Sequence, residues 1–529
     1  MNIIKYPIGI QSFADIIENQ YLYVDKTAYI HELVTTGKYY FLSRPRRFGK
    51  SLLLSTIESL YKGDKYLFEG LAISELDWNW DITYPVIHID FNGENFNDEN
   101  SLHKFLDDLL SKFEIKYKIE KRSKTFGFRF REIIQKAAEI NGSKAVVLID
   151  EYDKPILDAI GNVTLRESNR ETLQAFYSVL KSMDGFIQFG MLTGVSKFSK
   201  VSIFSGLNNL NDISLNTRYN SICGITEEEL LSYFSQGIED IAKNLNESVE
   251  EVQSSLKLYY DGYHFSKNGE DVYNPFSLLS AFANKDFSDY WFATGTPTSL
   301  IRLIEQSNFP MPEMEHYQCS EDILTGSDIY LSDPIPLLFQ SGYLTIKGYD
   351  KRFKLYTLGF PNKEVAEGFV NLLYKSFTKG SNKESLVKQF VMDVEQGHAR
   401  DFMEKLQIFF SGIPYDLLRS AKEDTHRHQH GQLEVHYQNI MYVIFKLMGF
   451  HTHAEFKTAN GRIDMMIETQ RYIYLLEFKI NSSAEIALHQ IDEKDYSMPF
   501  KSDGRTIIKI GANFDTKSRK LTDFIITEN

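Results

Sequence analysis

The sequence predicts a multidomain α/β protein, and three patterns carry that prediction. From Lys38 to about Leu210, short apolar strands alternate with helical segments, the order expected of a parallel α/β sheet. The stretch from Thr226 to about Tyr330 reads as helical, and a second compact α/β unit follows residue 430. A chain of 529 residues has room for roughly three or four domains. The expected domains are residues 1–215, 216–330, 331–425 and 426–529.

Composition narrows the class of protein. Hydrophobic residues make up 43% and charged residues 25%, as in ordinary soluble proteins. The net charge of −14 argues against a uniformly basic coat, so any contact with nucleic acid must be local. No signal-peptide pattern and no long apolar run occurs, so we expect a cytoplasmic protein without a membrane span. Cys223 and Cys319 have no metal-ligand spacing, which favours reduced thiols.

The first domain is expected to be built on four short apolar strands. They are Tyr39–Leu42, Pro85–Phe91, Lys144–Ile149 and Phe186–Thr193. An amphipathic helix, 51-SLLLSTIESLYKG-63, follows the first of them. The loop between that strand and that helix therefore lies at a helix N-terminus, whose free N–H groups and partial positive charge attract anions.

That loop, 44-RPRRFGKS-51, ends like the phosphate-binding motif G-x-x-x-x-G-K-[ST]. Lys50 would reach the β- and γ-phosphates of a nucleotide, Ser51 would ligate Mg²⁺, and Gly49 would let the backbone approach phosphate. Arg44 stands where the motif has its first glycine, and with Pro45 it must support the turn into the loop. The alternative is a basic surface turn that ends in GKS by accident.

A second element supports the nucleotide site. The strand in 144-KAVVLIDEYDKPI-156 ends in Asp150, suited to hold Mg²⁺, and Glu151, suited to polarise the attacking water. Taken alone, it could be a buried strand with a solvated acidic end. Thr193 ends the fourth strand and could sense the γ-phosphate if that strand lies between the other two.

Several motifs together resemble the AAA-ATPase-like family of bacterial and archaeal proteins, over about residues 1–300. They are RPRRFGKS, 21-YLYVDKT-27, LIDEYDKPI, 192-LTGVSKFSK-200, 203-IFSGLNNLND-212, 220-NSICGITEEEL-230 and 258-LYYDGYHFS-266. In that family an arginine-rich loop replaces the glycine-rich one. The resemblance implies ATP binding, and a homo-oligomer is possible. The implied nucleotide-binding residues are Arg46, Arg47, Phe48, Gly49, Lys50, Ser51, Asp150 and Thr193.

Some assignments in this half stay open. Arg46 and Arg47 could add charge at phosphate, or face DNA or a neighbouring subunit. Arg218 is a guess for an arginine finger. The middle of the chain begins with a helix capped by Thr226 and Glu229, and residues 338–377 read strand, turn, strand, helix, a possible winged module. The histidines of the following polar passage favour a solvated linker over a transition-metal site: His426, His428, His430 and His436.

The C-terminal unit reads in the order αβββαβ. The expected elements are helix 433–450, strands 451–458, 462–468 and 472–480, helix 484–496 and strand 505–514, with an Asn460–Gly461 turn between the first two strands. Asp464 interrupts an otherwise apolar strand. Glu477 and Lys479 share one face of the next strand.

Two carboxylates on neighbouring strands with a lysine can hold a hard divalent cation and position water beside phosphate. Glu434 would be an extra acidic ligand, and Gln490 and Tyr496 could orient Lys479 or contact a nucleic-acid backbone. Taken alone, the pair Glu477 and Lys479 could be a simple ion pair.

This unit resembles the PD-(D/E)XK nuclease superfamily over about residues 430–529, with Ile463 in place of the motif's proline. The resemblance implies a restriction-endonuclease-like fold, with Asp464, Glu477, Lys479 and Gln490 catalytic and Mg²⁺ or Mn²⁺ as cofactor. We therefore expect ATP-gated cleavage of phosphodiester bonds, with DNA favoured over RNA. The alternative is an ATP-driven signalling or nucleic-acid-binding switch whose nuclease-like domain cuts nothing.

Overall fold

The structure is a computed structural model of the chain. It describes residues 4–120, 125–197, 209–293, 304, 309–325, 333–378, 384–411, 439–449, 451–454, 457–458, 461–462, 464–515, 518 and 520–528. The chain divides into two compact units. Unit 1 comprises Met1–Leu300 and His316–Val365, and unit 2 comprises Ile301–Glu315 and Ala366–Asn529. The four-domain division expected from the sequence stays a prediction.

Unit 1 is built on a parallel sheet with the strand order β2-β3-β4-β1-β5. Its strands are β1 (Tyr39–Ser43), β2 (Val86–Asp90), β3 (Ala145–Asp150), β4 (Ile187–Gly194) and β5 (Asn211–Asp212). The four predicted strands are confirmed to within one residue at each end, and β5 is an addition. β4 lies between β1 and β3, although it follows both in the sequence.

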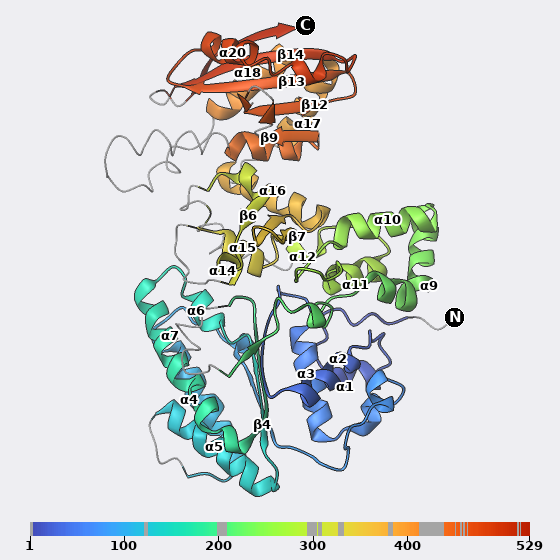
Figure 1. The fold of residues 1–529 in the computed structure, drawn as a ribbon, viewed down its shortest axis with the longest axis vertical. Coiled ribbons are helices and arrows are strands. Elements are labelled where there is room, and N and C mark those ends of the chain that lie inside the picture. Colours follow the sequence, from blue (N-terminus) through green and yellow to red (C-terminus); the bar gives the residue numbers. More distant parts are fainter. Residues whose placement is uncertain are drawn as a thin grey trace. The chain divides into compact units, whose positions relative to one another are not determined.

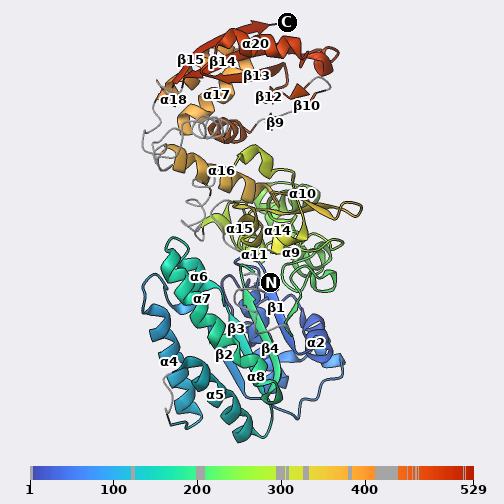
Figure 2. The same ribbon diagram turned by 60° about the vertical axis from the view of Figure 1, so that its left-hand side comes forward.

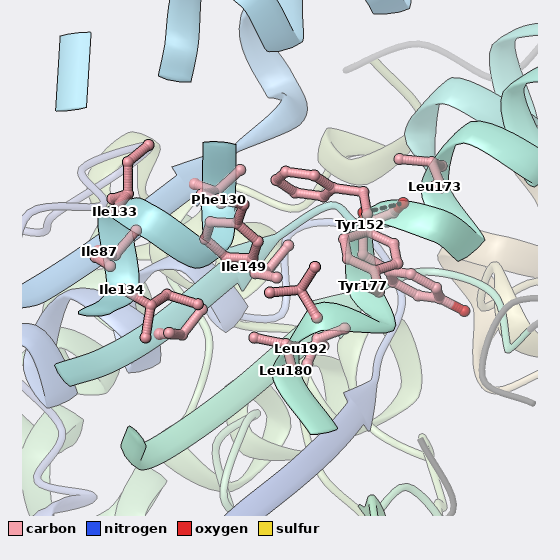
Figure 3. Close-up of a cluster of buried hydrophobic side chains, with 14 of the residues drawn as sticks. Ile87, Phe130, Ile133, Ile134, Ile149, Tyr152, Leu173, Tyr177, Leu180 and Leu192 are labelled. Atoms are coloured by element: carbon pink, nitrogen blue, oxygen red, sulfur yellow. Dashed lines mark hydrogen bonds between the residues drawn. The ribbon is translucent and has the colours of Figure 1, made fainter. Parts of the chain in front are cut away.

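Helices cover both faces of this sheet (Figure 1). They are α1 (Phe13–Glu18), α2 (Thr27–Thr36), α3 (Lys50–Lys62), α4 (Ser101–Lys116), α5 (Phe126–Asn141), α6 (Lys154–Asp158), α7 (Val163–Tyr177) and α8 (Val179–Ser182). Figure 3 shows the core in which Ile87 and Ile149 of the sheet meet Phe130 of α5 and Leu173 of α7. The alternation of strands and amphipathic helices predicts this layering, because each helix buries one apolar stripe against the sheet.

The rest of unit 1 is mostly helical. It contains α9 (Glu227–Leu245), α10 (Val249–Tyr260), α11 (Pro275–Asn284) and α12 (Tyr290–Ala293). The capping box predicted at α9 is present, with Thr226 and Glu229 each bonding the other's backbone. The helical prediction for Thr226–Tyr330 is wrong at β6 (Tyr317–Cys319), which pairs with a strand that follows much later.

β6 belongs to a three-stranded antiparallel sheet with the order β6-β8-β7. The associated elements are α14 (Glu321–Thr325), α15 (Ile335–Gln340), β7 (Thr345–Asp350), β8 (Leu355–Gly359) and α16 (Lys363–Thr378). The strand, turn, strand and helix expected over residues 338–377 are therefore confirmed.

Unit 2 has a mixed five-stranded sheet with the order β15-β14-β13-β12-β9 (Figure 2). Its elements are α17 (Glu384–Gln396), α18 (Ala399–Ser411), β9 (His451–Ala454), β10 (Lys457–Thr458), β11 (Gly461–Arg462), β12 (Met465–Glu468), β13 (Tyr472–Ile480), α20 (Ala484–Glu493), β14 (Thr506–Asp515) and β15 (Lys520–Glu528). Only β13 and β14 pair in parallel.

The predicted order αβββαβ holds through β14, and β15 extends it. Of the first predicted helix, residues 439–449 are described, and 439–447 are helical. β10 and β11 pair at the predicted Asn460–Gly461 turn, with Thr458 opposite Gly461, so Gly461 belongs to β11 instead of the turn. None of the helices in the described ranges combines the length and apolar character required to cross a bilayer.

Candidate functional sites

The first candidate site lies at the carboxyl ends of the strands of unit 1, where open α/β sheets bind ligands. Strand pairing sets Thr193 of β4 opposite Leu42 of β1, and Asp150 of β3 opposite Asp90 of β2. Because β4 separates β1 from β3, Thr193 stands between the phosphate loop and Asp150. The sequence argument for Thr193 depended on this strand order, and the structure has it.

Asp150 is the centre of this site. Ser51 Oγ donates to Asp150 Oδ2 and Thr193 Oγ1 donates to Asp150 Oδ1, both at 2.5 Å. Asp150 is only 2% exposed. A hydroxyl and a carboxylate side by side are the oxygen ligands that Mg²⁺ takes in proteins, so these residues fit that ion.

Lys50 is buried beside the same residues. Its Nζ donates to the carbonyl oxygens of Arg44 (3.1 Å) and Pro45 (3.2 Å) and lies 3.5 Å from Glu151 Oε1. Gly49 has φ 90° at the start of α3, a conformation that favours glycine. Glu151 has φ 51°, an uncommon value for a residue with a side chain. The backbone thus turns sharply at both elements that the sequence assigns to nucleotide chemistry.

Arg44 replaces the first glycine of the motif by anchoring the loop. Its side chain is 1% exposed and donates to four carbonyl oxygens, those of Ser43, Ser214, Tyr219 and Asn220, at 2.8–3.4 Å. The guanidinium carbon lies 4.1 Å from the centre of the Phe265 ring. Burial lowers the pKa of Arg44 to about 10. The guanidinium therefore ties the loop to a segment about 170 residues later rather than facing a ligand.

The other loop residues divide into exposed and buried ones. Arg46 and Arg47 are exposed, and the Arg47 guanidinium lies over the ring of Phe276. Phe48 is buried edge-on against Tyr263 and Phe265. Arg218, the guess for an arginine finger, is exposed and pairs with Glu32 of α2.

An apolar pocket adjoins the loop. It has a volume of about 100 Å³, and Gly49 forms part of its wall. Its other walls come from the segment before β1, from α3 and from residues 222–225 and 275–279. The motif YLYVDKT contributes Tyr23, Val24 and Lys26, so this motif carried a signal that sequence reasoning did not connect with a pocket.

Two carboxylates near Asp150 were missed from the sequence. Asp90 ends β2, and burial together with the charge of Asp150 raises its pKa. Asp153 is fully buried, and burial with the charge of Glu151 raises its pKa to about 6. The signal for Asp153 was available, because its motif DEYD carries a third acidic residue beyond the two that were used.

The second candidate site lies in unit 2. Asp464 directly precedes β12 instead of interrupting it, and its Oδ2 accepts the Phe478 N–H at 2.9 Å. Glu477 is 1% exposed on β13, and its Oε2 has no hydrogen-bond partner among the described residues. Burial, and then the charge of Asp464, raises the pKa of Glu477 to about 7. A buried carboxylate oxygen without a partner beside a second carboxylate fits a cation ligand.

Lys479 lies between Glu477 and the following helix. Its Nζ is 2.9 Å from Glu477 Oε1 and donates to Gln490 Oε1 at 2.6 Å. Gln490 Nε2 in turn donates to the Tyr496 hydroxyl at 3.4 Å. The structure therefore brings together all the predicted residues of this site that it describes. Glu434 and the four linker histidines lie outside the described residues.

The fold and the two sites define a chain that joins an AAA-ATPase-like unit to a PD-(D/E)XK nuclease-like unit. Residues 7–204 match the family described as predicted AAA-ATPase, and residues 432–524 match the PD-(D/E)XK nuclease superfamily. The chain belongs to the family of proteins that combine these two parts. A relative of nearly the same length is the "Uncharacterized protein in vnfD 5'region" of Azotobacter chroococcum mcd 1. It is 36% identical over 531 residues, which cover 99% of this chain and 98% of the relative.

Among solved structures, the ORC2 protein of Aeropyrum pernix in ADPNP–ADP complexes is similar at 12% identity. The match covers 68% of this chain and 92% of that chain, with a TM-score of 0.24. That TM-score is too low to indicate more than a loose likeness.

Proposed function

We propose that unit 1 binds and hydrolyses ATP and that unit 2 cleaves DNA phosphodiester bonds with a divalent cation, under the control of ATP. The observation that carries the first part is the group of Ser51, Asp150 and Thr193, joined by hydrogen bonds beside Lys50. The apolar pocket next to Gly49 suits the adenine base, because such pockets bury flat apolar surface. Loop and pocket together offer a place for each end of ATP.

In this proposal each residue of the first site has one task. The N–H groups at the start of α3 and Lys50 bind the phosphates. Ser51 and Asp150 would hold a magnesium ion, which would supply positive charge beside the phosphoryl oxygens. Glu151 orients the attacking water and accepts its proton, and Thr193 contacts the γ-phosphate.

In the second site Asp464 and Glu477 would hold the divalent cation, which would supply positive charge for the attack of a water on phosphorus at neutral pH. Lys479 stabilises negative charge building on the phosphate oxygens, and Gln490 keeps the lysine in place through the 2.6 Å hydrogen bond. DNA as the substrate, the choice between Mg²⁺ and Mn²⁺, and assembly into a homo-oligomer belong to the same proposal.

The experiment is cleavage of supercoiled plasmid by the full chain with Mg²⁺ or Mn²⁺, with and without ATP. We expect Glu477→Gln to abolish cleavage. Glu485→Gln, an isosteric change at an exposed residue of α20, serves as the matched control and should cleave like the wild type. Lys50→Ala should abolish ATP hydrolysis and any effect of ATP on cleavage. Failure of the wild type to cut DNA or RNA under every condition would favour the alternative, an ATP-driven binding switch.

A further inference from the structure

Asp153 lies behind the first site and contacts no residue of the phosphate loop in the contacts described. Its carboxylate is fully buried and accepts hydrogen bonds from the end of β4. The donors are Val195 N (3.1 Å), Ser196 N (2.6 Å) and Ser196 Oγ (2.7 Å), all to Oδ2. These donors directly follow Thr193 and Gly194 in the chain, so the hydrogen bonds of Asp153 fix the position of the segment next to Thr193.

The hydrogen bonds of Asp153 lie just beyond the point where β3 and β4 stop pairing. The last paired residues of β3 and β4 are Ile149 and Leu192. Beyond them, Tyr152 N donates to the Thr193 carbonyl at 3.1 Å and the Tyr152 hydroxyl donates to the Ser196 carbonyl at 2.9 Å. The two hydrogen bonds of Tyr152 and those of Asp153 therefore connect the chain after β3 with the chain after β4.

The close approach of the two chains depends on Gly194. A Cβ atom there would lie 2.5 Å from Asp153 Oδ1, which is closer than real contacts allow. On the other side, the Tyr177 hydroxyl donates to the Tyr152 carbonyl at 3.2 Å, as Figure 3 shows. The turn that carries Asp153 is therefore fastened to the core of unit 1.

We propose that Asp153 is a positioning residue for ATP hydrolysis, which holds Thr193 where it meets Asp150 and the terminal phosphate. This inference rests on the proposed ATPase function. Burying a carboxylate is costly unless donors surround it, and three donors converge on Oδ2 while the Val195 N–H also reaches Oδ1 at 3.4 Å. An asparagine has nearly the same shape, but with its carbonyl oxygen in the place of Oδ2 its amide N–H₂ stands in the place of Oδ1 and faces the Val195 N–H, donor against donor. A carboxylate is therefore required at this position to accept the hydrogen bonds of Val195 and Ser196, although it contacts no substrate.

The test compares ATP hydrolysis and ATP binding by the full chain in four variants. Asp153→Asn should lower kcat by roughly 10- to 100-fold, the scale on which misplacement of a reacting group acts. Binding of a fluorescent ATP analogue should stay unchanged, because Lys50 and Ser51 are untouched. Asp158→Asn, the same substitution at a carboxylate of α6 that pairs with Lys154, is the matched control and should keep the wild-type kcat.

Ser196→Ala removes one donor and keeps the carboxylate, so it tests the same contact should Asp153→Asn fold poorly. We expect a smaller loss of kcat, and a double variant no slower than Asp153→Asn alone. Parallel losses of kcat, nucleotide affinity and melting temperature would show a purely structural role and overturn the inference. If the wild type hydrolyses ATP and the Asp153→Asn variant is equally active, this inference alone is overturned. If the wild type hydrolyses no ATP, the proposed function is overturned as well.

Discussion

Arg44 shows how one residue can satisfy a motif by different means. A glycine at this place in a phosphate loop would supply backbone freedom. Arg44 instead supplies a buried guanidinium whose hydrogen bonds to carbonyl oxygens hold the loop in one conformation. The hydrogen bonds of Arg44 therefore fix the loop, and its stability depends on a side chain that the glycine-rich motif lacks at this position.

Restoring the motif should consequently damage the protein. We expect Arg44→Gly to lower the free energy of unfolding by about 3–5 kcal/mol, because a cavity forms and buried carbonyl groups lose their partners. Affinity for ATP should fall with it. Urea unfolding and nucleotide titration measure the two effects, and Arg46→Gly, at an exposed neighbour, is the control for stability. Tighter ATP binding by Arg44→Gly would show that the missing glycine, and not the guanidinium, limits the loop.

Glu364 gives unit 1 a dependence on pH. This carboxyl accepts the Trp291 N–H at 2.6 Å, and burial raises its pKa from 4.5 to about 7. The folded chain therefore holds the proton more tightly than the unfolded chain does. The stability that Glu364 contributes is complete below about pH 4.5 and is lost as pH rises through about 7.

Glu364→Gln should remove this loss. Above pH 8 the variant should be more stable than the wild type by about 3 kcal/mol, since the pKa rises from 4.5 to about 7 and one unit of pKa corresponds to about 1.4 kcal/mol. Melting temperatures of both proteins between pH 5 and pH 9, roughly the range over which most proteins stay folded, would reveal it. Glu247→Gln, at an exposed position, should change nothing. Equal pH slopes for wild type and Glu364→Gln would contradict the assignment.

At the scale of elements, the second site depends on how closely α20 packs on the sheet. Gly511 of β14 lies directly beneath α20, and a Cβ atom there would lie 2.4 Å from the Ala484 carbonyl oxygen. The helix carries Gln490, which bonds Lys479. Any displacement of α20 therefore moves a residue that holds the lysine.

Gly511→Ala should destabilise unit 2 by about 1–3 kcal/mol, the usual result of overpacking. We also expect reduced cleavage of plasmid DNA with unchanged ATP hydrolysis. Ile486→Ala, on the exposed side of α20, should leave both activities as they are. If the Gly511→Ala protein is less stable but cleaves DNA normally, the packing of α20 does not influence catalysis at the second site.

The sequence predicted the elements better than the contacts between them. Strand positions followed from short apolar runs, and the candidate residues of both sites followed from a loop motif and from polar groups on strands, while their roles stay predictions. β15 was missed although its partner β14 directly precedes it, because most of its residues are not buried. β5 and β6 were missed because each pairs with a strand that is distant in the sequence. The anchoring of Arg44 by residues near 214–220 and the burial of Glu477 were missed for the same reason, since local pattern carries no information on distant partners.

At the scale of the whole molecule, the two units should unfold separately, because each has its own core. Calorimetry should resolve two transitions. ATP with Mg²⁺ at about 100 times its Kd should stabilise only unit 1, by about 2.7 kcal/mol. Lys50→Ala should abolish that shift. A single transition that moves with ATP would show that the units unfold as one.

The place of β4 in the sheet also determines when the first site can form during synthesis. β1 and β3 precede β4 in the chain, but they are joined in the sheet only through β4, which ends at Gly194. The carbonyl groups that anchor Arg44 arrive later still, up to Asn220. A nascent chain that ends before that residue contains all residues of the phosphate loop but lacks part of the carbonyl groups that fix its conformation through Arg44. On the ribosome, we therefore expect nucleotide binding only after the chain has been made to about residue 220.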